Sequence, residues 1–393
     1  MQGMHVLLIR LLLSVVFLIP PTAAFSQKVA AERVAKTQLY DVRAVTVVAG
    51  LYHPWGLAFL PDGRMLVTER RGTMRIIDGG KLVAKPIEGI PKAAEHGQGG
   101  LLDVALHPKY AENGWVYWTY NAGKSGEYGT ELARGKLGGS RDAPVMNNVE
   151  VLFQLQPKTG TAVHFGSRIV FDRQGFLYVT LGDRGDSPAK GAAQRAQQLN
   201  DLAGKSIRLH DDGRVPADNP FVKTPGARPE IFTYGNRNMQ GAALHPDTGR
   251  VWAHEHGPQG GDEVNILTAG GNYGWPVITY GANYGSGTKI GEGTNREGIV
   301  PPLHYWVPSI APSGMAFYKG AVFPKWDGNL FVGALANQSL VRLTLNGDKI
   351  ASEERIFEGK LGRIRDVRQG PDGFIYLLTD AAEGELLRIE IAK

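Results

Sequence analysis

The sequence predicts an all-β protein, a six-bladed β-propeller made of four-stranded antiparallel blades. Two observations support this prediction: one hairpin-like unit recurs six times along the 393 residues, and only one short stretch has convincing helical character. Each unit joins an apolar residue, a Pro or Asp corner and a Gly turn to an apolar strand, as in a β-hairpin. The six copies are FLPDGRMLVTE (59–69), LHPKYAENGWVYWTY (106–120), FDRQGFLYVTLGD (171–183), LHPDTGRVWAHE (244–255), FPKWDGNLFVGAL (323–335) and GPDGFIYLLTD (370–380).

The spacing of the copies indicates what each one represents. A four-stranded propeller blade takes about 40–50 residues, and the longer intervals between copies are explained by loop insertions. Six blades around one axis make residues 27–393 a single domain. The turn glycines that define the spacing are Gly63, Gly114, Gly175, Gly249, Gly328 and Gly373.

The segments outside the copies complete the predicted fold. We expect the strand at 41–48 to pair with the C-terminal strand at 385–391, which closes the ring and hides both sheet edges. Residues 189–199, AKGAAQRAQQL, are the predicted short helix, and a second Asp-Gly hairpin follows within GKSIRLHDDGRVPADNPF. The Gly-rich loop at 281–302 is expected on the face where the central channel opens, because propellers bind ligands there.

The first 26 residues have the form of a secretory signal peptide. A lone Arg10 precedes a short apolar run, and small residues follow it, so cleavage is expected after Ala24 or Ser26. An uncleaved N-terminal anchor is the alternative. No later segment approaches the ~18 continuous apolar residues of a membrane helix. We therefore expect a mature protein that does not span a membrane and is periplasmic or secreted.

Composition excludes several classes of function. The chain has no cysteine, which rules out a cysteine nucleophile, a thiolate zinc site, an iron–sulfur cluster and covalently attached c-type haem. Its 43 basic and 38 acidic residues give a net charge of +5 without a polybasic tract, so no nucleic-acid partner is expected. GxSxG, HExxH, P-loop and GxGxxG motifs are missing from the sequence, which argues against a nucleophile-elbow serine and NAD dependence.

The stretch at 255–276, EHGPQGGDEVNILTAGGNYGWP, has the composition of a cage for a hard cation. Its glycines allow the main chain to approach a ligand closely, and Glu255, Asp262 and Glu263 supply oxygen ligands. A solvated loop between strands is the alternative.

Polar residues precede or begin the repeated strands of several blades. His164, before the third hairpin, is a candidate general base, and a hydrogen-bonded loop histidine is the alternative. Arg363 and Arg365 are two residues apart, so they should face the same way in an extended segment and attract a ligand with several carboxylates. The alternative is a basic edge paired with Asp366.

Three further polar residues occupy matching positions in other blades. Arg237 and Asn238 follow the strand at 231–233 and precede the fourth copy, and Gln98 lies before the second copy. Residues that precede the same element of different blades should meet at one face of a propeller.

With these residues the sequence resembles a known family, the soluble pyrroloquinoline quinone (PQQ) dependent sugar dehydrogenases, and within it the aldose sugar dehydrogenase branch. The blocks that carry the resemblance are GQGGLLDVALHP, HFGSRIVFD, YGNRNMQG, EHGPQGGDEVN with GGNYGWP, and RIRDV. The resemblance implies a six-bladed propeller with PQQ lying across the channel mouth. It also implies oxidation of an aldose at C1 to the lactone, with electrons leaving to an external quinone, cytochrome or dye.

The resemblance also assigns roles to individual residues. His164 would take the proton from the anomeric hydroxyl while hydride passes from C1 to C5 of the quinone, and Arg237 would neutralise charge that develops on the cofactor. The carbonyls of Gly257 and Pro258 would hold Ca²⁺ against PQQ as a Lewis acid. The remaining implied PQQ contacts are Gln98, Asn238, Tyr284, Ala334, Leu335, Ala336, Arg363 and Arg365.

A second Ca²⁺ site and two departures from the family pattern follow from the same comparison. The second site would use Glu263 and the main chain at Tyr273. Ala336 stands where family members often carry a lysine, so one PQQ-binding cation is missing. Arg184 replaces the glutamine of the glucose-specific branch, which leaves sugar preference open.

Two other functions remain open from the sequence. A calcium-dependent propeller lactonase would explain the 255–276 stretch but leaves Arg363 with Arg365 unexplained. A non-catalytic propeller that binds glycans or proteins would retain the fold without turnover.

Overall fold

A computed structural model describes residues 33–124, 126–185 and 194–392. Within the unit Arg33–Lys393, these residues form six antiparallel sheets, five with four strands and one with five. The predicted six-bladed β-propeller is therefore confirmed. The predicted signal peptide lies outside the described residues. Among the described residues, no helix is long and apolar enough to cross a membrane.

The first three blades follow one another along the chain. Blade 1 contains β3 (Pro54–Phe59), β4 (Met65–Glu69), β5 (Thr73–Asp78) and β6 (Lys81–Leu82). Blade 2 contains β7 (Leu101–Leu106), β8 (Trp115–Lys124), β9 (Glu127–Ser140) and β10 (Ala143–Gln154), with the short helix α2 (Tyr110–Asn113) in its first turn. Blade 3 contains β11 (Ile169–Phe171), β12 (Leu177–Leu181), β13 (Lys205–Leu209) and β14 (Ile231–Tyr234).

The remaining blades complete the ring. Blade 4 contains β15 (Gly241–Leu244), β16 (Val251–Glu255), β17 (Asp262–Ile266) and β18 (His304–Trp306). Blade 5 contains β19 (Pro312–Phe317), β20 (Leu330–Ala334), β21 (Leu340–Asn346) and β22 (Lys349–Ile356), with the 3₁₀ turn η3 (Pro324–Trp326) before β20. Blade 6 contains β23 (Ile364–Gln369), β24 (Ile375–Thr379), β25 (Gly384–Ile391), β2 (Asp41–Leu51) and β1 (Val34–Lys36).

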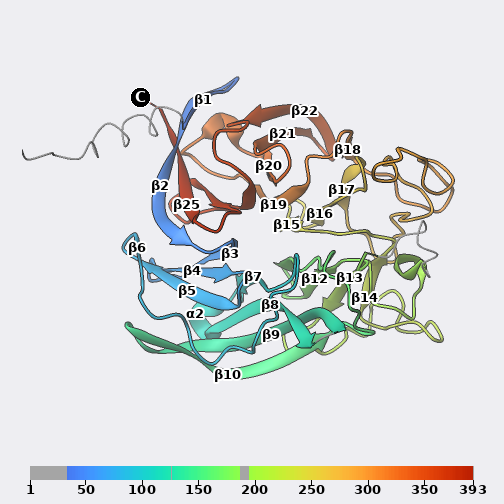
Figure 1. The fold of residues 1–393 in the computed structure, drawn as a ribbon, viewed down its shortest axis with the longest axis horizontal. Helices are drawn as coiled ribbons and strands as arrows, with labels where there is room; N and C mark the ends of the chain where they lie inside the picture. Colours follow the sequence, from blue (N-terminus) through green and yellow to red (C-terminus); the bar gives the residue numbers. More distant parts are fainter. Residues whose placement is uncertain (1–32, 125, 186–193, 393) are drawn as a thin grey trace, which may run out of the picture. The chain divides into compact units, whose positions relative to one another are not determined.

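The sheets surround a common centre, and the first strand of each blade contacts the first strand of the next (Figure 1). The order of these contacts is β3, β7, β11, β15, β19, β23 and back to β3. The ring closes through the antiparallel pair β2–β25, in which Val42 lies opposite Ile391. The predicted pairing of these two strands is thus confirmed.

The six predicted turns join the first and second strands of the six blades. Each turn glycine has a positive φ, between +67° at Gly249 and +87° at Gly63, a conformation that favours glycine. Second strands such as β12, β20 and β24 are buried along their whole length because neighbouring blades cover both faces. For example, Trp252 of β16 packs edge-on against Phe317 of β19, with ring centroids 5.5 Å apart.

The predicted helix at 189–199 is wrong over its described part, and residues 189–193 lie outside the described residues. Only a 3₁₀ turn, η2 (Arg195–Gln197), forms there, after a residue with φ of +50° at Gln194. The Ala196 carbonyl accepts from the buried Lys205 ammonium at 3.0 Å and from the Gly235 N–H at 2.8 Å, so it does not serve a helical amide. The Arg195 carbonyl also accepts from Lys205, at 2.9 Å, and closes only the 3₁₀ turn with the Gln198 N–H. A tertiary contact therefore replaces the local preference.

The second predicted Asp-Gly hairpin is also only partly formed. The turn at Gly213 closes with a hydrogen bond from His210 N–H to the Arg214 carbonyl. No strand follows directly, because the described residues 214–230 form turns and β13 pairs instead with β14.

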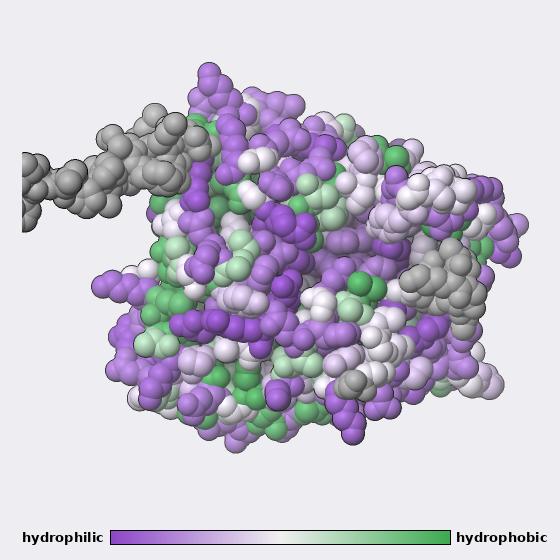
Figure 2. Space-filling model, viewed as in Figure 1, coloured by the Kyte–Doolittle hydropathy of each residue, from purple (hydrophilic) through white to green (hydrophobic). Residues whose placement is uncertain are grey.

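Charged side chains cross-link the first strands near the centre of the ring. Arg168, which is 1% exposed, contacts Asp103 of β7 at 2.9 Å and Asp366 of β23 at 3.0 Å. Arg368 bridges the same two carboxylates at 2.6 and 2.8 Å. These pairs connect blades 2, 3 and 6, and they fix the strands that carry the candidate site. On the face shown in Figure 2, hydrophilic residues gather near the middle.

Candidate active site

The predicted site residues lie at the same end of the first strands and contact one another. The His164 N–H donates to Gln98 Oε1 at 2.9 Å, which connects the segments before β11 and β7. Asn238, before β15, accepts from the Gly166 N–H at 3.1 Å. Hydrogen bonds between side chains and main chain thus join three blades around His164.

His164 lies in a left-handed conformation, with φ of +55°. Its Nδ1 is 2.6 Å from Asp183 Oδ1, and its side chain is 13% exposed. A carboxylate only accepts hydrogen bonds, so Nδ1 carries the proton and Nε2 is left with a lone pair. Burial lowers the pKa of His164; Asp183 acts in the opposite direction and the charge of Arg237 lowers the pKa further. The imidazole is therefore neutral near pH 7 and can accept a proton.

Asp183 and Trp275 support His164, and the sequence reasoning missed both. Asp183 Oδ2 accepts from Trp275 Nε1 at 2.7 Å, and the Asp183 N–H donates to the Arg237 carbonyl. Asp183 ends the third copy of the repeat, where it looks like a turn residue. A histidine that acts as a base commonly has a carboxylate that orients its ring, and this requirement could have indicated Asp183.

Arg237 lies between His164 and the 255–276 stretch. Its Nη1 donates to the carbonyls of His256 and Gly257 at 3.0 and 2.6 Å, and its guanidinium lies 5.1 Å from the ring centroid of Trp275. The Arg237 guanidinium therefore places positive charge beside the His164 imidazole. Among the described residues, no carboxylate forms an ion pair with this guanidinium.

Arg363 and Arg365 both reach Asp380, so the alternative pairing with Asp366 is wrong. Arg365 is buried and contacts Asp380 Oδ2 at 2.7 Å, whereas the Arg363 side chain is 47% exposed and lies 3.3 Å from the same oxygen. His53 binds the other carboxylate oxygen at 2.8 Å. Although burial raises the pKa of Asp380, the charge of Arg365 and hydrogen bonds from His53 and Arg365 lower it below its usual value. Because Arg363 and Arg365 share the single carboxylate of Asp380, this group of side chains keeps a net positive charge.

The cation ligands predicted at 255–276 are only partly available. Asp262 is not free to bind an ion, because it accepts from Ser309 Oγ at 2.7 Å and from the Gly257, Ile310 and Ala311 amides at 2.8–3.0 Å. The carboxylate thus holds the loop instead, which corrects the prediction for this residue. The described residues also contain no group of three or more His, Cys, Asp or Glu side chains arranged to hold a metal.

Two other carboxylates of this stretch face a small cavity of about 10 Å³, which is enough for one water molecule. Its walls include Glu255, Glu263, Gly257 and Tyr273. Burial raises the pKa of Glu255 to about 7. Burial and the charge of Glu255 raise the pKa of Glu263 well above its usual value. Glu255 already accepts hydrogen bonds from Asn236 Nδ2 at 3.0 Å and from the Arg237 N–H. Glu263 accepts a longer one from Asn265 Nδ2 at 3.4 Å, so Glu263 is the carboxylate with oxygen left for a cation.

The remaining implied cofactor contacts lie around the ring with fewer interactions. The Leu335 carbonyl accepts from Arg363 Nη1 at 3.4 Å, which brings the end of β20 next to the arginine pair. Ala334 is buried and Ala336 is exposed. Tyr284 is 69% exposed, and no contact found among the described residues joins its side chain to His164 or to the arginines.

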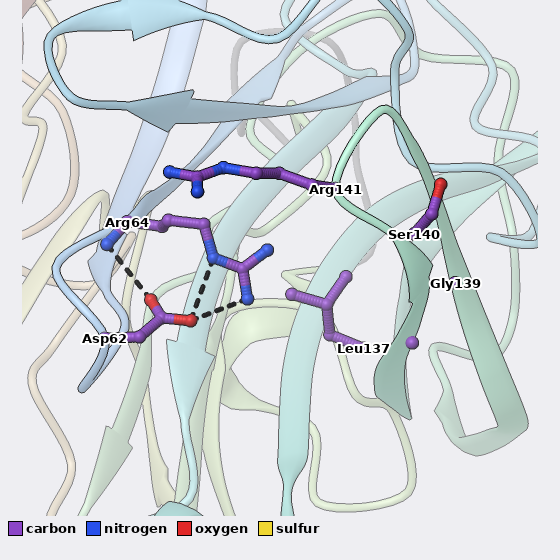
Figure 3. A pocket seen from close by; sticks show the side chains of 7 residues that line it. Asp62, Arg64, Leu137, Gly139, Ser140 and Arg141 are labelled. Atoms are coloured by element: carbon purple, nitrogen blue, oxygen red, sulfur yellow. Dashed lines mark hydrogen bonds and ion pairs between the residues drawn. The ribbon is translucent and has the colours of Figure 1, made fainter.

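A larger hollow of about 420 Å³ lies elsewhere, between the first turn of blade 1 and the β9–β10 hairpin. Figure 3 shows Arg64 bound to Asp62 in this hollow, with the Arg141 side chain extending over Arg64 from the turn between β9 and β10. Arg141 pairs with Asp78. Both arginines already have carboxylate partners, so the hollow lacks the unbalanced charge found near His164.

The chain is similar to sugar dehydrogenases over most of its length. Residues 51–388 match the glucose/sorbosone dehydrogenase family. Aldose sugar dehydrogenase YliI of Escherichia coli (strain K12) is 46% identical over 343 residues, covering 86% of this chain and 90% of the relative. The apo crystal structure of the soluble aldose sugar dehydrogenase from Escherichia coli has a TM-score of 0.84 at 44% identity, covering 89% of this chain and 100% of that one. The PQQ-bound aldose sugar dehydrogenase from Streptomyces coelicolor has a TM-score of 0.72 at 30% identity, covering 89% and 98%.

Proposed function

The chain belongs to the glucose/sorbosone dehydrogenase family of sugar dehydrogenases, and from this premise we propose that it oxidises aldoses at C1 to lactones with PQQ and Ca²⁺. The observation that carries the proposal is the neutral His164, oriented by Asp183 and surrounded by cationic side chains at one end of the ring.

His164 is the general base of the proposed reaction. Its Nε2 takes the proton of the anomeric hydroxyl, while the two electrons leave C1 as a hydride. Asp183 keeps the proton on Nδ1 and stabilises the imidazolium that forms. PQQ, when bound, would supply the electrophilic carbon that accepts the hydride. Arg237, held by the Gly257 carbonyl, would offset negative charge that develops on the acceptor.

The residues present fit PQQ as a ligand with several carboxylates. Arg363 and Arg365 share one carboxylate, Asp380, and so retain positive charge for an anionic group. Gln98 and Asn238 would contact the cofactor beside His164, and Leu335 places main chain next to Arg363. Ala334, Ala336 and Tyr284 are assigned to the cofactor by family resemblance.

Calcium is assigned by family resemblance, and its chemistry there would be that of a Lewis acid. The carbonyls of Gly257 and Pro258 would hold the ion beside PQQ, and in this structure the Gly257 carbonyl accepts from Arg237. Glu263, with the main chain at Tyr273, would hold a second ion, and the small cavity between Glu255 and Glu263 supports that assignment.

Location and electron transfer complete the proposal. We assign residues 1–26 to a signal peptide and residues 27–393 to one exported domain that functions in the periplasm or outside the cell. Because the sequence has no cysteine for attaching c-type haem, an external quinone, cytochrome or dye would accept the electrons.

The test is reconstitution of the purified full chain with PQQ and CaCl₂, followed by reduction of a redox dye with a panel of aldoses. We expect sugar-dependent dye reduction and a change in the quinone absorption spectrum on adding sugar. No turnover with any aldose despite bound PQQ would refute the activity, and lack of PQQ binding would refute the cofactor assignment. Lactone hydrolysis by cofactor-free protein would favour a lactonase instead.

A further inference from the structure

Arg184 connects the strand end that carries Asp183 to the loop that carries His164. Its guanidinium donates from Nη1 to the carbonyls of Val163 and His164, the latter at 3.0 Å, and from Nη2 to the Thr161 carbonyl at 2.7 Å. One side chain therefore holds three carbonyls of the four-residue segment 161–164. The fork of a guanidinium matches this arrangement, because it presents several donors in one plane.

The Arg184 guanidinium is a charged group shielded from solvent. Arg184 is 1% exposed, and no carboxylate of the described residues lies within 4.0 Å of its guanidinium. Burial lowers the pKa of Arg184 to about 9. The ring of Phe165 lies 3.6 Å below the guanidinium and offsets part of the desolvation. Burial of a cation without a carboxylate partner is energetically costly, which indicates that the contacts of Arg184 with the three carbonyls have a functional role.

The backbone conformation of His164 indicates what the contacts of Arg184 do. A left-handed conformation costs a residue with a side chain about 1–2 kcal/mol, so the φ of +55° must be imposed by its surroundings. Gln98 holds the His164 N–H, Arg184 holds its carbonyl, and Asp183 holds its ring. The segments that carry His164 and Asp183 also pack closely at Gly182, where an added Cβ would lie 2.1 Å from the His164 carbonyl oxygen.

We propose that Arg184 is a positioning residue for proton transfer by His164. By fixing the carbonyls of segment 161–164 it holds the imidazole at the height and angle from which Nε2 reaches the anomeric hydroxyl. The adjacent Asp183 fixes only the rotation of the ring, so the two consecutive residues have separate tasks. This inference rests on the proposed function, in which His164 is the base.

The test compares Arg184→Lys and Arg184→Gln with wild type in the full chain loaded with PQQ and Ca²⁺. Lysine keeps the charge but not the planar fork, and glutamine keeps two donors but not the charge. A misplacement of about 1 Å can cost about 100-fold in rate, so we expect kcat to fall about 10- to 100-fold in both variants. The dissociation constant of PQQ should stay within about threefold of wild type. Arg342→Lys is the control, since Arg342 is equally buried but pairs with Glu354 in blade 5.

The pH profile distinguishes positioning from a purely structural role. The charged groups that act on His164 are Asp183, Arg237 and Arg184. Arg184→Gln removes a nearby positive charge, so the acid limb of kcat/KM should move to higher pH. Arg184→Lys retains the charge, so its acid limb should stay near that of wild type while kcat falls.

Several results would overturn the inference. A kcat within about twofold of wild type in Arg184→Lys would show that the fork is not needed for positioning. A kcat that falls only in proportion to PQQ occupancy would assign Arg184 to the cofactor pocket instead. If Arg184→Gln does not fold, Arg184→Lys alone decides. Absence of aldose turnover in the wild type would refute the proposed function and this inference with it, whereas an active wild type with unchanged variants would refute this inference alone.

Discussion

Replacement of Asp183 by asparagine tests how the base of the proposed reaction is prepared. Asp183 is completely buried and accepts three hydrogen bonds: from His164 Nδ1 at 2.6 Å, Trp275 Nε1 at 2.7 Å and the Gly185 N–H at 2.8 Å. His164 Nδ1 and the Gly185 N–H share Oδ1, whereas Trp275 Nε1 binds Oδ2. In Asp183→Asn an amide oxygen at the Oδ2 position keeps the bond to Trp275 and directs the NH₂ at His164 Nδ1, which moves the imidazole proton to Nε2 and blocks the base. The opposite orientation keeps the proton on Nδ1 but sets the NH₂ against the indole N–H of Trp275.

The size of the effect follows from the bond that must break to restore the active tautomer. To restore it, the amide must turn so that the buried Trp275 N–H loses its acceptor, and an unsatisfied buried donor costs about 1–3 kcal/mol. Since about 1.4 kcal/mol corresponds to a factor of ten in rate, we expect kcat to fall about 10- to 100-fold. The Asp183 charge raises the pKa of His164, so its removal lowers that pKa, and the acid limb of kcat/KM moves to lower pH.

The assay is dye reduction at saturating PQQ and Ca²⁺ across pH 5 to 9. Asp62→Asn is the matched control, because Asp62 binds Arg64 in the hollow of Figure 3, away from His164. A kcat within about threefold of wild type in Asp183→Asn would refute the argument from the tautomer. A shift of the acid limb to higher pH would refute the argument from charge.

Three further changes test the other parts of the site. His164→Ala should keep PQQ binding and lose about 100-fold or more in turnover, measured by dye reduction and PQQ titration, and near wild-type turnover would remove His164 from the mechanism. Arg365→Ala should weaken PQQ binding about 30- to 100-fold, and Arg363→Ala less than about tenfold, because only Arg365 is buried; the reverse order would contradict the assignment. Glu263→Gln should at least halve the rise in Tm caused by Ca²⁺ and change kcat by less than about threefold; a large loss of kcat with an unchanged Tm would show that Glu263 serves the catalytic ion.

The fold could be predicted because its signals are local. Each Pro or Asp corner with its glycine specifies a turn within a few residues, and six such turns specify six blades. The prediction of a helix at 189–199 failed for the opposite reason, since the Lys205 ammonium and the Gly235 N–H bind the Ala196 carbonyl that a helix would use. The sequence carries no local sign of that contact.

The candidate site could be predicted only in part. Gln98, Asn238 and His164 share a position relative to their strands, so the repeat itself indicated that they meet. Asp183 and Trp275 are far apart in the sequence, and the residues around them give no indication of the hydrogen bond between them. Asp262 had the composition of a metal ligand, but its amide partners from the segment before β19 are visible only in three dimensions.

The pairing of β2 with β25 places the first and last long strands in one sheet. Contacts between such distant parts of a chain form slowly, because a large loop must be closed before any stabilisation is gained. During synthesis the edge of β2 that pairs with β25 stays unpaired until β25 has emerged. The same blade contains β23, which carries Arg365. We therefore expect the ability to bind an anion at Arg365 to develop late in folding, after the ring of blades is complete.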